Sequence, residues 1–193
     1  MYMKKTKLPR ILGCDPGKRN FAVSVVELHG VVPVVLDAGM IEMPFDSLKI
    51  GFRNEQDAFL EELHDEWISK WNPSCIAAER FQARGTTGGN TGELVSFVLG
   101  LISLQYRSTP MLLTHAAGWK NPFNKAHDEQ DQLDKLYKWC MTPEHMLDAS
   151  LIGCYGLSKG ANVVLEYDVR EFICGLEEVS REELINRKAR KES

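Results

Sequence analysis

Three runs rich in Val, Ile and Leu lie close together near the start of the chain, at residues 11–15, 21–28 and 31–42. The Pro16-Gly17 and His29-Gly30 pairs separate them, and such pairs are typical of tight turns. Short turns of this kind join neighbouring antiparallel strands. The segment therefore predicts a three-stranded antiparallel meander, and any fold for the chain must contain these strands side by side.

After residue 54 the spacing of apolar residues becomes that of a helix, and this run ends at Asn72-Pro73. Further segments follow in alternation: a strand at 74–79, a flexible Gly/Thr loop at 85–92, a helix at 93–107 and a strand at 110–114. The order βββαβαβ is expected of a mixed five-stranded sheet flanked by helices. The predicted fold class is α/β.

Helices dominate the rest of the sequence. We expect helices at 128–140 and from Thr142-Pro143 onward, a strand at 163–167, and a capped final helix at 181–191.

Size and composition indicate one domain. With 193 residues, 44% of them hydrophobic, the chain can bury a substantial core. The apolar run at 94–104 is interrupted and too short to span a bilayer, and no apolar segment follows the first lysines. We therefore expect a soluble, unprocessed protein with no membrane partner.

Cysteine usage indicates the cellular compartment of the protein, and its net charge bears on whether it binds nucleic acid. Five scattered cysteines without CxxC spacing indicate reduced thiols of a cytosolic protein. The net charge of −4 does not favour nucleic-acid binding, but it does not exclude such binding. Binding depends on how the charges are distributed over the surface, and bound cations would neutralise part of the negative charge.

Four side chains carry most of the chemical information. Asp15 ends the first predicted strand and Glu79 ends the fourth. His145 and Asp148 are three residues apart, so they share one face of the predicted helix, with Cβ atoms about 5–6 Å apart. Charges at such positions are costly unless a cation or proton compensates them. A divalent metal site is the simplest common explanation.

The motifs around these residues resemble those of the RuvC family of Holliday-junction resolvases. The segment ILGCDPGKRNFAVSVVE resembles the first-strand motif, CIAAERFQARG the second acidic motif, and EHMLDASLIGCYGL the terminal-helix motif. THAAGWKNPFNK resembles the basic segment that follows the fifth strand of the family. The likeness covers residues 8–157, and the small size looks more like the bacteriophage branch than the cellular one.

The resemblance implies an RNase H-like nuclease domain at 1–157, followed by a C-terminal extension at 158–193. It implies a cytoplasmic homodimer, in the host cytoplasm if phage-encoded, that makes paired nicks across four-way DNA junctions and other branched DNA. The implied catalytic residues and metal ligands are Asp15, Glu79, His145 and Asp148, which would hold two Mg²⁺ ions, or Mn²⁺ in their place. Two departures stand out: His145 occupies a position where many members have Asp, and Phe81 lies closer to Glu79 than in the common pattern.

Basic and aromatic residues near these motifs are candidates for contact with DNA. They are Lys18, Arg19, Asn20, Arg80, Phe81, Arg84, Lys120 and Lys125. The first three would meet backbone phosphate beside the metals. Phe81 would stack on an unpaired base at the branch point, or else be a core aromatic. The two later lysines would follow the phosphates of a second arm.

Other readings of the sequence stay open. Another RNase H-like nuclease, acting on RNA–DNA hybrids or resembling the YqgF RNases, would share the carboxylates. An actin-like ATPase or sugar kinase also begins with an apolar strand and an Asp, but the one candidate for its second phosphate loop, at 85–92, follows the wrong element. A catalytically silent junction-binding scaffold is disfavoured, because the carboxylates would be an uncompensated burden without metal.

Overall fold

The computed structural model describes residues 9–17, 19–30, 32–43, 53–81, 89–126 and 143–161. Its strands are β1 (Arg10–Pro16), β2 (Asn20–His29), β3 (Val32–Glu42), β4 (Cys75–Glu79) and β5 (Met111–Thr114). Its helices are α1 (Arg53–Leu63), a π-helical turn η1 (His64–Ser69), α2 (Gly89–Gln105), α3 (Ala116–Ala126) and α5 (Glu144–Ala161).

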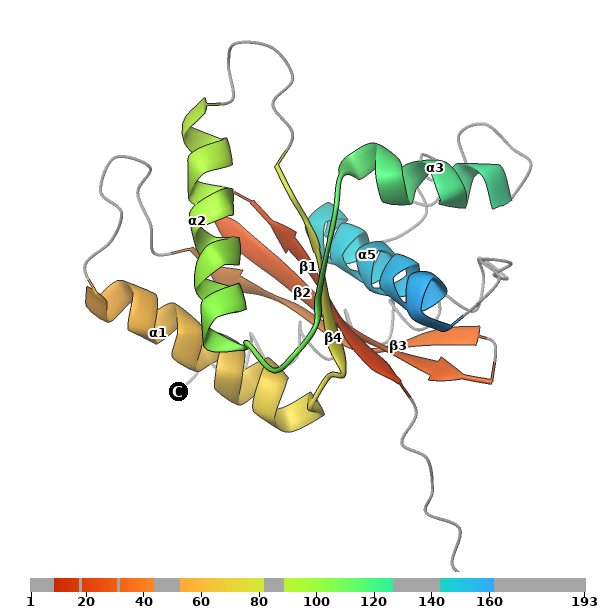
Figure 1. Cartoon of the computed structure of the whole chain (residues 1–193), viewed down its shortest axis with the longest axis horizontal. Coiled ribbons are helices and arrows are strands. Elements are labelled where there is room, and N and C mark those ends of the chain that lie inside the picture. The colour runs from red at the N-terminus through yellow and green to blue at the C-terminus, as the bar shows by residue number, and fades with distance from the viewer. Residues whose placement is uncertain are drawn as a thin grey trace, which may run out of the picture.

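The strands form one mixed sheet in the order β3-β2-β1-β4-β5 (Figure 1). β1, β2 and β3 pair antiparallel, whereas β4 pairs parallel with β1 and β5 pairs parallel with β4. The predicted meander and the predicted five-stranded mixed sheet are both confirmed. The parallel pairing of β1 with β4 brings the C-terminal ends of these two strands to the same end of the sheet.

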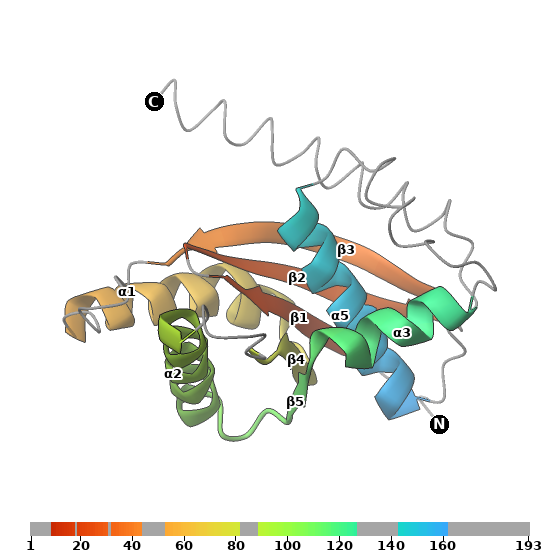
Figure 2. The same ribbon diagram turned by 90° about the horizontal axis from the view of Figure 1, so that it is seen from above.

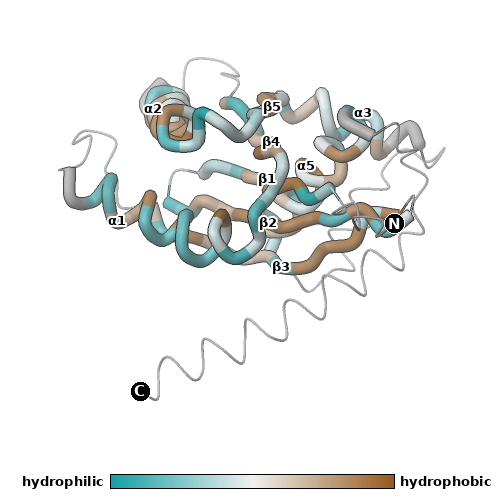
Figure 3. Tube along the Cα trace, turned by 60° about the horizontal axis from the view of Figure 1, so that its bottom comes forward, coloured by the Kyte–Doolittle hydropathy of each residue, from teal (hydrophilic) through white to brown (hydrophobic). Residues whose placement is uncertain are grey.

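Helices cover both faces of the sheet, and each face has its own hydrophobic cluster. α3 and α5 lie together on one side of the strands, and α1 and α2 lie on the other (Figures 1 and 2). Along β1 the side chains alternate between the clusters, because Ile11 packs with α5 while Leu12 and Cys14 pack with α1 and α2. The strands carry the most hydrophobic stretches, and α1 is largely hydrophilic (Figure 3).

Helix α5 lies unusually close to the sheet because glycines face each other where it crosses β1. A Cβ atom on Gly13 would overlap the carbonyl oxygen of Ala149 and come within 2.7 Å of the backbone nitrogen of Gly153. A Cβ on Gly156 would lie 2.8 Å from Cβ of Ala77 in β4. The position of α5 over β1 and β4 is thus fixed by contact of backbone with backbone.

A buried pair of hydroxyl groups adds a polar tie between α5 and β2. The Ser150 hydroxyl donates to the carbonyl oxygen of Met146 at 2.8 Å and lies 2.9 Å from Oγ of Ser24, and both serines are fully buried. Buried hydroxyls that are hydrogen-bonded in this way fix the rotation of a helix as well as its distance.

Three local features differ from the sequence prediction. Helix α2 begins at Gly89, so it takes in part of the predicted Gly/Thr loop, and η1 interrupts the predicted regular helix that ends at Trp71. Helix α3 was not predicted. None of the described helices combines the length and apolar character that a bilayer-spanning segment needs.

Several predicted elements fall outside the described residues. These are the helices at 128–140 and 181–191 and the strand at 163–167. The division at residue 157 stays a prediction, and α5 itself continues to Ala161.

Candidate active site

Asp15 and Glu79 lie next to each other at the ends of neighbouring strands. In the β1–β4 register Cys14 pairs with Ala78, and the next residue on each strand is the carboxylate. Both carboxylates alternate onto the face that α5 covers, because Gly13 and Ala77, two residues earlier, contact that helix. The predicted adjacency of the two strand ends is therefore what the sheet provides.

Helix α5 brings His145 directly to Asp15. Nδ1 of His145 lies 2.8 Å from Oδ2 of Asp15, in a hydrogen bond between residues 130 apart in sequence. The Asp15 side chain is 14% exposed and the His145 side chain 54%, so the imidazole stands at the open side of the pair. Asp148, one turn along the same helix, is buried.

The carboxylates around His145 favour its charged form. The hydrogen bond to Asp15 raises the pKa of His145 above its ordinary value, partial burial opposes this, and the charges of Asp15, Asp148 and Glu144 add to the rise. The pair is consequently an imidazolium–carboxylate ion pair over a wider range of pH than a free histidine would allow. It is the kind of titratable contact from which a metal ion can displace a proton.

Glu79 is held by a residue of α3. The indole Nε1–H of Trp119 donates to Oε2 of Glu79 at 2.6 Å, and Trp119 is fully buried in the cluster beneath α5. Helix α3 starts two residues after Thr114, the β5 partner of Glu79. The chain thus turns back from β5 and places the indole over the carboxylate of the neighbouring strand.

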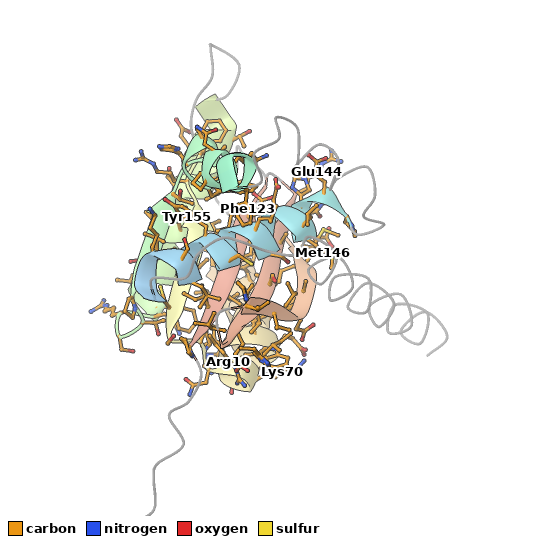
Figure 4. All side chains as sticks on the ribbon, turned by 90° about the vertical axis from the view of Figure 1, so that its right-hand side faces the viewer. Arg10, Lys70, Phe123, Glu144, Met146 and Tyr155 are labelled. Carbon is orange, nitrogen blue, oxygen red and sulfur yellow. The ribbon has the colours of Figure 1, made fainter. Side chains whose placement is uncertain are left out.

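The residue after Trp119 reaches the remaining carboxylate. Nζ of Lys120 lies 3.6 Å from Oδ2 of Asp148 and 4.8 Å from the centroid of the Trp119 ring. Lys120 therefore lies within the acidic cluster, and its predicted contact with a second DNA arm stays a prediction. In Figure 4 α3, marked by Phe123, is seen nearly end-on above α5, whose first turn is marked by Glu144 and Met146.

The residue types of this cluster suit a hard divalent cation. Three carboxylates and one imidazole offer oxygen and nitrogen donors of the kind that bind Mg²⁺ and Mn²⁺. Asp15 and His145 already converge. Within the described part of the chain, however, no three His, Cys, Asp or Glu side chains lie close enough to hold one ion. The chemistry of the donor set fits a metal, with Asp15 and His145 already in contact and Glu79 on the neighbouring strand.

Two predicted DNA-contacting residues flank the acidic cluster in the turn between β1 and β2. Arg19 and Asn20 are both exposed. Backbone bonds hold the turn, with Gly17 N–H donating to the Asn20 carbonyl at 2.9 Å and Met43 N–H to the Arg19 carbonyl at 2.8 Å. Lys18 and Arg84 lie outside the described residues, as does the side chain of Lys125.

Arg80 and Phe81 follow Glu79 at the end of β4. Arg80 is exposed, and its backbone N–H donates to the Thr114 carbonyl at 2.7 Å, which extends the pairing with β5 by one residue. Phe81 is half-buried, and its ring packs so closely on α2 that a Cβ on Gly92 would meet it at 2.6 Å. Part of the Phe81 ring therefore packs on α2. A role for Phe81 at a branch point stays a prediction.

Trp119 is the functional candidate that the sequence reasoning did not assign. It was treated as one aromatic of a basic segment, because nothing in the sequence predicts that this segment is a helix lying over Glu79. In the structure His115 directly follows β5, and its Nδ1 accepts a hydrogen bond from Gly118 N–H at 2.8 Å at the start of the helix.

No protein-family model and no curated protein sequence matches the chain. Solved structures do. The chain is similar to Thermus thermophilus RuvC in complex with a Holliday junction substrate, with a TM-score of 0.62 at 14% identity, over 79% of this chain and 96% of that one. A second Thermus thermophilus RuvC structure matches with a TM-score of 0.54 at 14% identity, over 80% and 97%. The chain therefore has an RNase H-like fold of the form seen in the RuvC-type Holliday junction resolvases.

Proposed function

We propose that this chain is a metal-dependent, structure-selective DNA endonuclease that resolves four-way junctions by paired nicks. One observation carries the proposal: Asp15 meets His145 at 2.8 Å, beside Glu79 on the next strand and with Asp148 one helical turn away, at one edge of the sheet. The likeness of fold adds support, because it extends over 96% of a RuvC whose structure holds a Holliday junction substrate.

The acidic cluster would hold two Mg²⁺ ions, with Mn²⁺ as a substitute. Asp15, from the central strand, would be shared between them, while Glu79, His145 and Asp148 would complete the set. When bound, such a pair of ions supplies an activated water and stabilises the leaving oxygen of a phosphodiester.

The chain's own residues would bind and orient the DNA. Arg19, Asn20 and Arg80 are exposed around the carboxylate edge, where they can reach phosphate oxygens of the backbone. Lys120 sits beside Asp148 and brings a permanent positive charge to an otherwise acidic cluster. His145, exposed at the entrance, would ligate a metal ion or help to position the attacking water once its imidazole is deprotonated.

A homodimer would supply the second cut. Two opposed strands must be nicked, and a junction with twofold symmetry is matched by a protein with twofold symmetry. The segments α1–η1 and α2 are our candidates for the interface, since α2 is apolar around its circumference and carries the exposed Leu104.

The test uses labelled four-way, three-way, duplex and RNA–DNA hybrid substrates, with Mg²⁺, Mn²⁺ or EDTA. We expect symmetric nicks in the four-way junction with either metal and none in EDTA. If the four-way junction stays intact while the hybrid is cut, the chain is a different RNase H-like nuclease. Binding of the junction without any cutting would indicate a scaffold protein.

A further inference from the structure

We propose that Trp119 is a positioning residue that sets the orientation of Glu79 for metal binding. This inference rests on the proposed function and adds to it a residue that ligates nothing itself. Its starting point is the 2.6 Å hydrogen bond from the indole Nε1–H to Oε2 of Glu79.

The chemistry of the indole suits this task. An indole N–H is only a donor, so it can hold a carboxylate without competing for the cation that the carboxylate binds. A hydrogen bond to a charged acceptor is short and roughly twice as strong as a neutral one, and a bond to one oxygen fixes the plane of the group. Partners of this kind orient metal ligands, and their loss commonly costs 10–100-fold in metal affinity.

The surroundings of Trp119 make the donor rigid. The side chain is fully buried beside Phe123 and the α5 residues Leu147 and Leu151. The turn before it is equally constrained, because a Cβ on Gly118 would come within 2.7 Å of Oγ1 of Thr114. The donor therefore cannot follow Glu79 if the carboxylate rotates, and the carboxylate must adapt to the donor.

Helix α3 also links Glu79 to Asp148. Lys120 lies over the Trp119 ring and 3.6 Å from Asp148, so one turn of helix touches carboxylates from β4 and from α5. A shift of α3 would move both contacts together.

A plainer reading is that a buried indole N–H needs an acceptor and Glu79 supplies one. The molecule offers a matched control for it. Nε1–H of Trp71 donates to Oδ2 of Asp37 at 3.2 Å, also between an indole and a carboxylate, but with no predicted metal ligand involved. Under the plainer reading Trp119→Phe and Trp71→Phe should alter stability only.

The experiment measures binding of Mg²⁺ and Mn²⁺ to the DNA-free protein by calorimetry. Trp119→Phe, which keeps an aromatic ring and removes the donor, should weaken binding about 10–100-fold. Trp71→Phe should change it less than about twofold. Equal affinity in Trp119→Phe and wild type would overturn the inference while leaving the proposed function intact.

A second measurement needs no substitution in the protein that is tested. In the ¹⁵N spectrum of the wild type, the indole N–H signal of Trp119 should move on addition of Mg²⁺, whereas that of Trp71 should stay in place; the two Phe variants serve only to assign the signals. A Trp119 signal that ignores saturating metal would contradict the inference even if Trp119→Phe fails to fold. If the wild type binds no divalent metal at all, the proposed function fails first and the inference falls with it.

Discussion

The sheet carries acidic side chains at opposite ends, and each end combines cations with imidazole and indole partners in a different way. At the end marked by Arg10 and Lys70 in Figure 4, Glu27 is ion-paired with Arg10 and also meets His29 at 2.8 Å, while Asp37 is ion-paired with Lys70 and also accepts a hydrogen bond from the Trp71 indole. At the other end Asp15 meets a titratable imidazole and Glu79 a neutral indole, while Asp148 meets a lysine at 3.6 Å.

The comparison distinguishes carboxylates that stabilise the fold from carboxylates that are proposed to bind a cation. Arg10 is the cross-strand partner of Glu27 in the β1–β2 register and also donates to the Trp71 carbonyl at 3.1 Å. This permanently charged side chain therefore links β1, β2 and the segment at Trp71. A neutral or titratable donor instead orients a carboxylate and leaves its negative charge for a cation. We therefore expect substitutions at the two ends to separate stability from activity.

Asp15→Asn should have the largest effect. Under the proposed function, losing the ligand shared by the two ions should reduce junction cleavage on the order of a thousandfold. Junction binding should stay unchanged or become tighter, because the proposed phosphate contacts are made by other residues. Cleavage assays and gel-shift titrations on the same preparation measure the two quantities. Parallel loss of binding and cleavage would show that Asp15 has a structural role like that of Glu27.

Gly13→Ala should damage both properties, since the added Cβ forces α5 away from β1. We expect a loss of about 3 kcal/mol in the free energy of unfolding and about a hundredfold in cleavage from displaced ligands. The control is Gly100→Ala in α2, where nothing lies within 4 Å of the new Cβ. That variant should gain about 0.5–1 kcal/mol. Urea unfolding compares them, and equal stabilities would refute the close approach.

Glu27→Gln should lower the free energy of unfolding and leave the cleavage rate nearly unchanged. It leaves the half-buried Arg10 without its ion-pair partner, at an expected cost of about 2 kcal/mol after allowance for the exposure of the arginine. Cleavage per folded molecule should stay within about twofold of wild type. Cleavage that falls more steeply than the folded fraction would break the division between the two ends.

The ion pair of His145 with Asp15 should have the smallest effect, which is a pH dependence of the free energy of unfolding in the metal-free protein. Folding raises the pKa of His145, so the ion pair with Asp15 stabilises fully below the unfolded value of about 6.5 and is lost as pH rises through the folded value. Because the imidazole is more than half exposed, the gain should be well under about 1 kcal/mol. Unfolding in EDTA at pH 6 and pH 9 should show it in wild type and not in His145→Gln.

The strand ends of the acidic cluster could be predicted because their position follows from local patterns. Tight turns force β1, β2 and β3 into a meander, and the crossover through α1 returns β4 parallel to β1. Asp15 and Glu79 each stand at the last position of an apolar run. Given that strand order, their adjacency follows from register alone.

Helix α3 could not be predicted because packing overrides propensity there. Gly118 and Pro122 both disfavour helix, yet burial of Trp119 and Phe123 holds the segment helical. The contact of Lys120 with Asp148 depends on where that helix lies. The same holds for η1, where a buried Trp67 packs on Gly39 of β3, a contact that the local sequence does not predict.

The long sequence interval between Asp15 and His145 has a consequence for synthesis. A growing chain makes the first carboxylate early and its imidazole partner 130 residues later, after the five strands of the described sheet have been produced. Until α5 has been made, the apolar face on which it packs lacks the larger part of its cover and the carboxylates have no partner from α5. A nascent chain on the ribosome can thus hold a nearly complete sheet while the proposed active site still lacks the two residues from α5. Under the proposed function, the order of synthesis would therefore keep the chain inactive until α5 has been made.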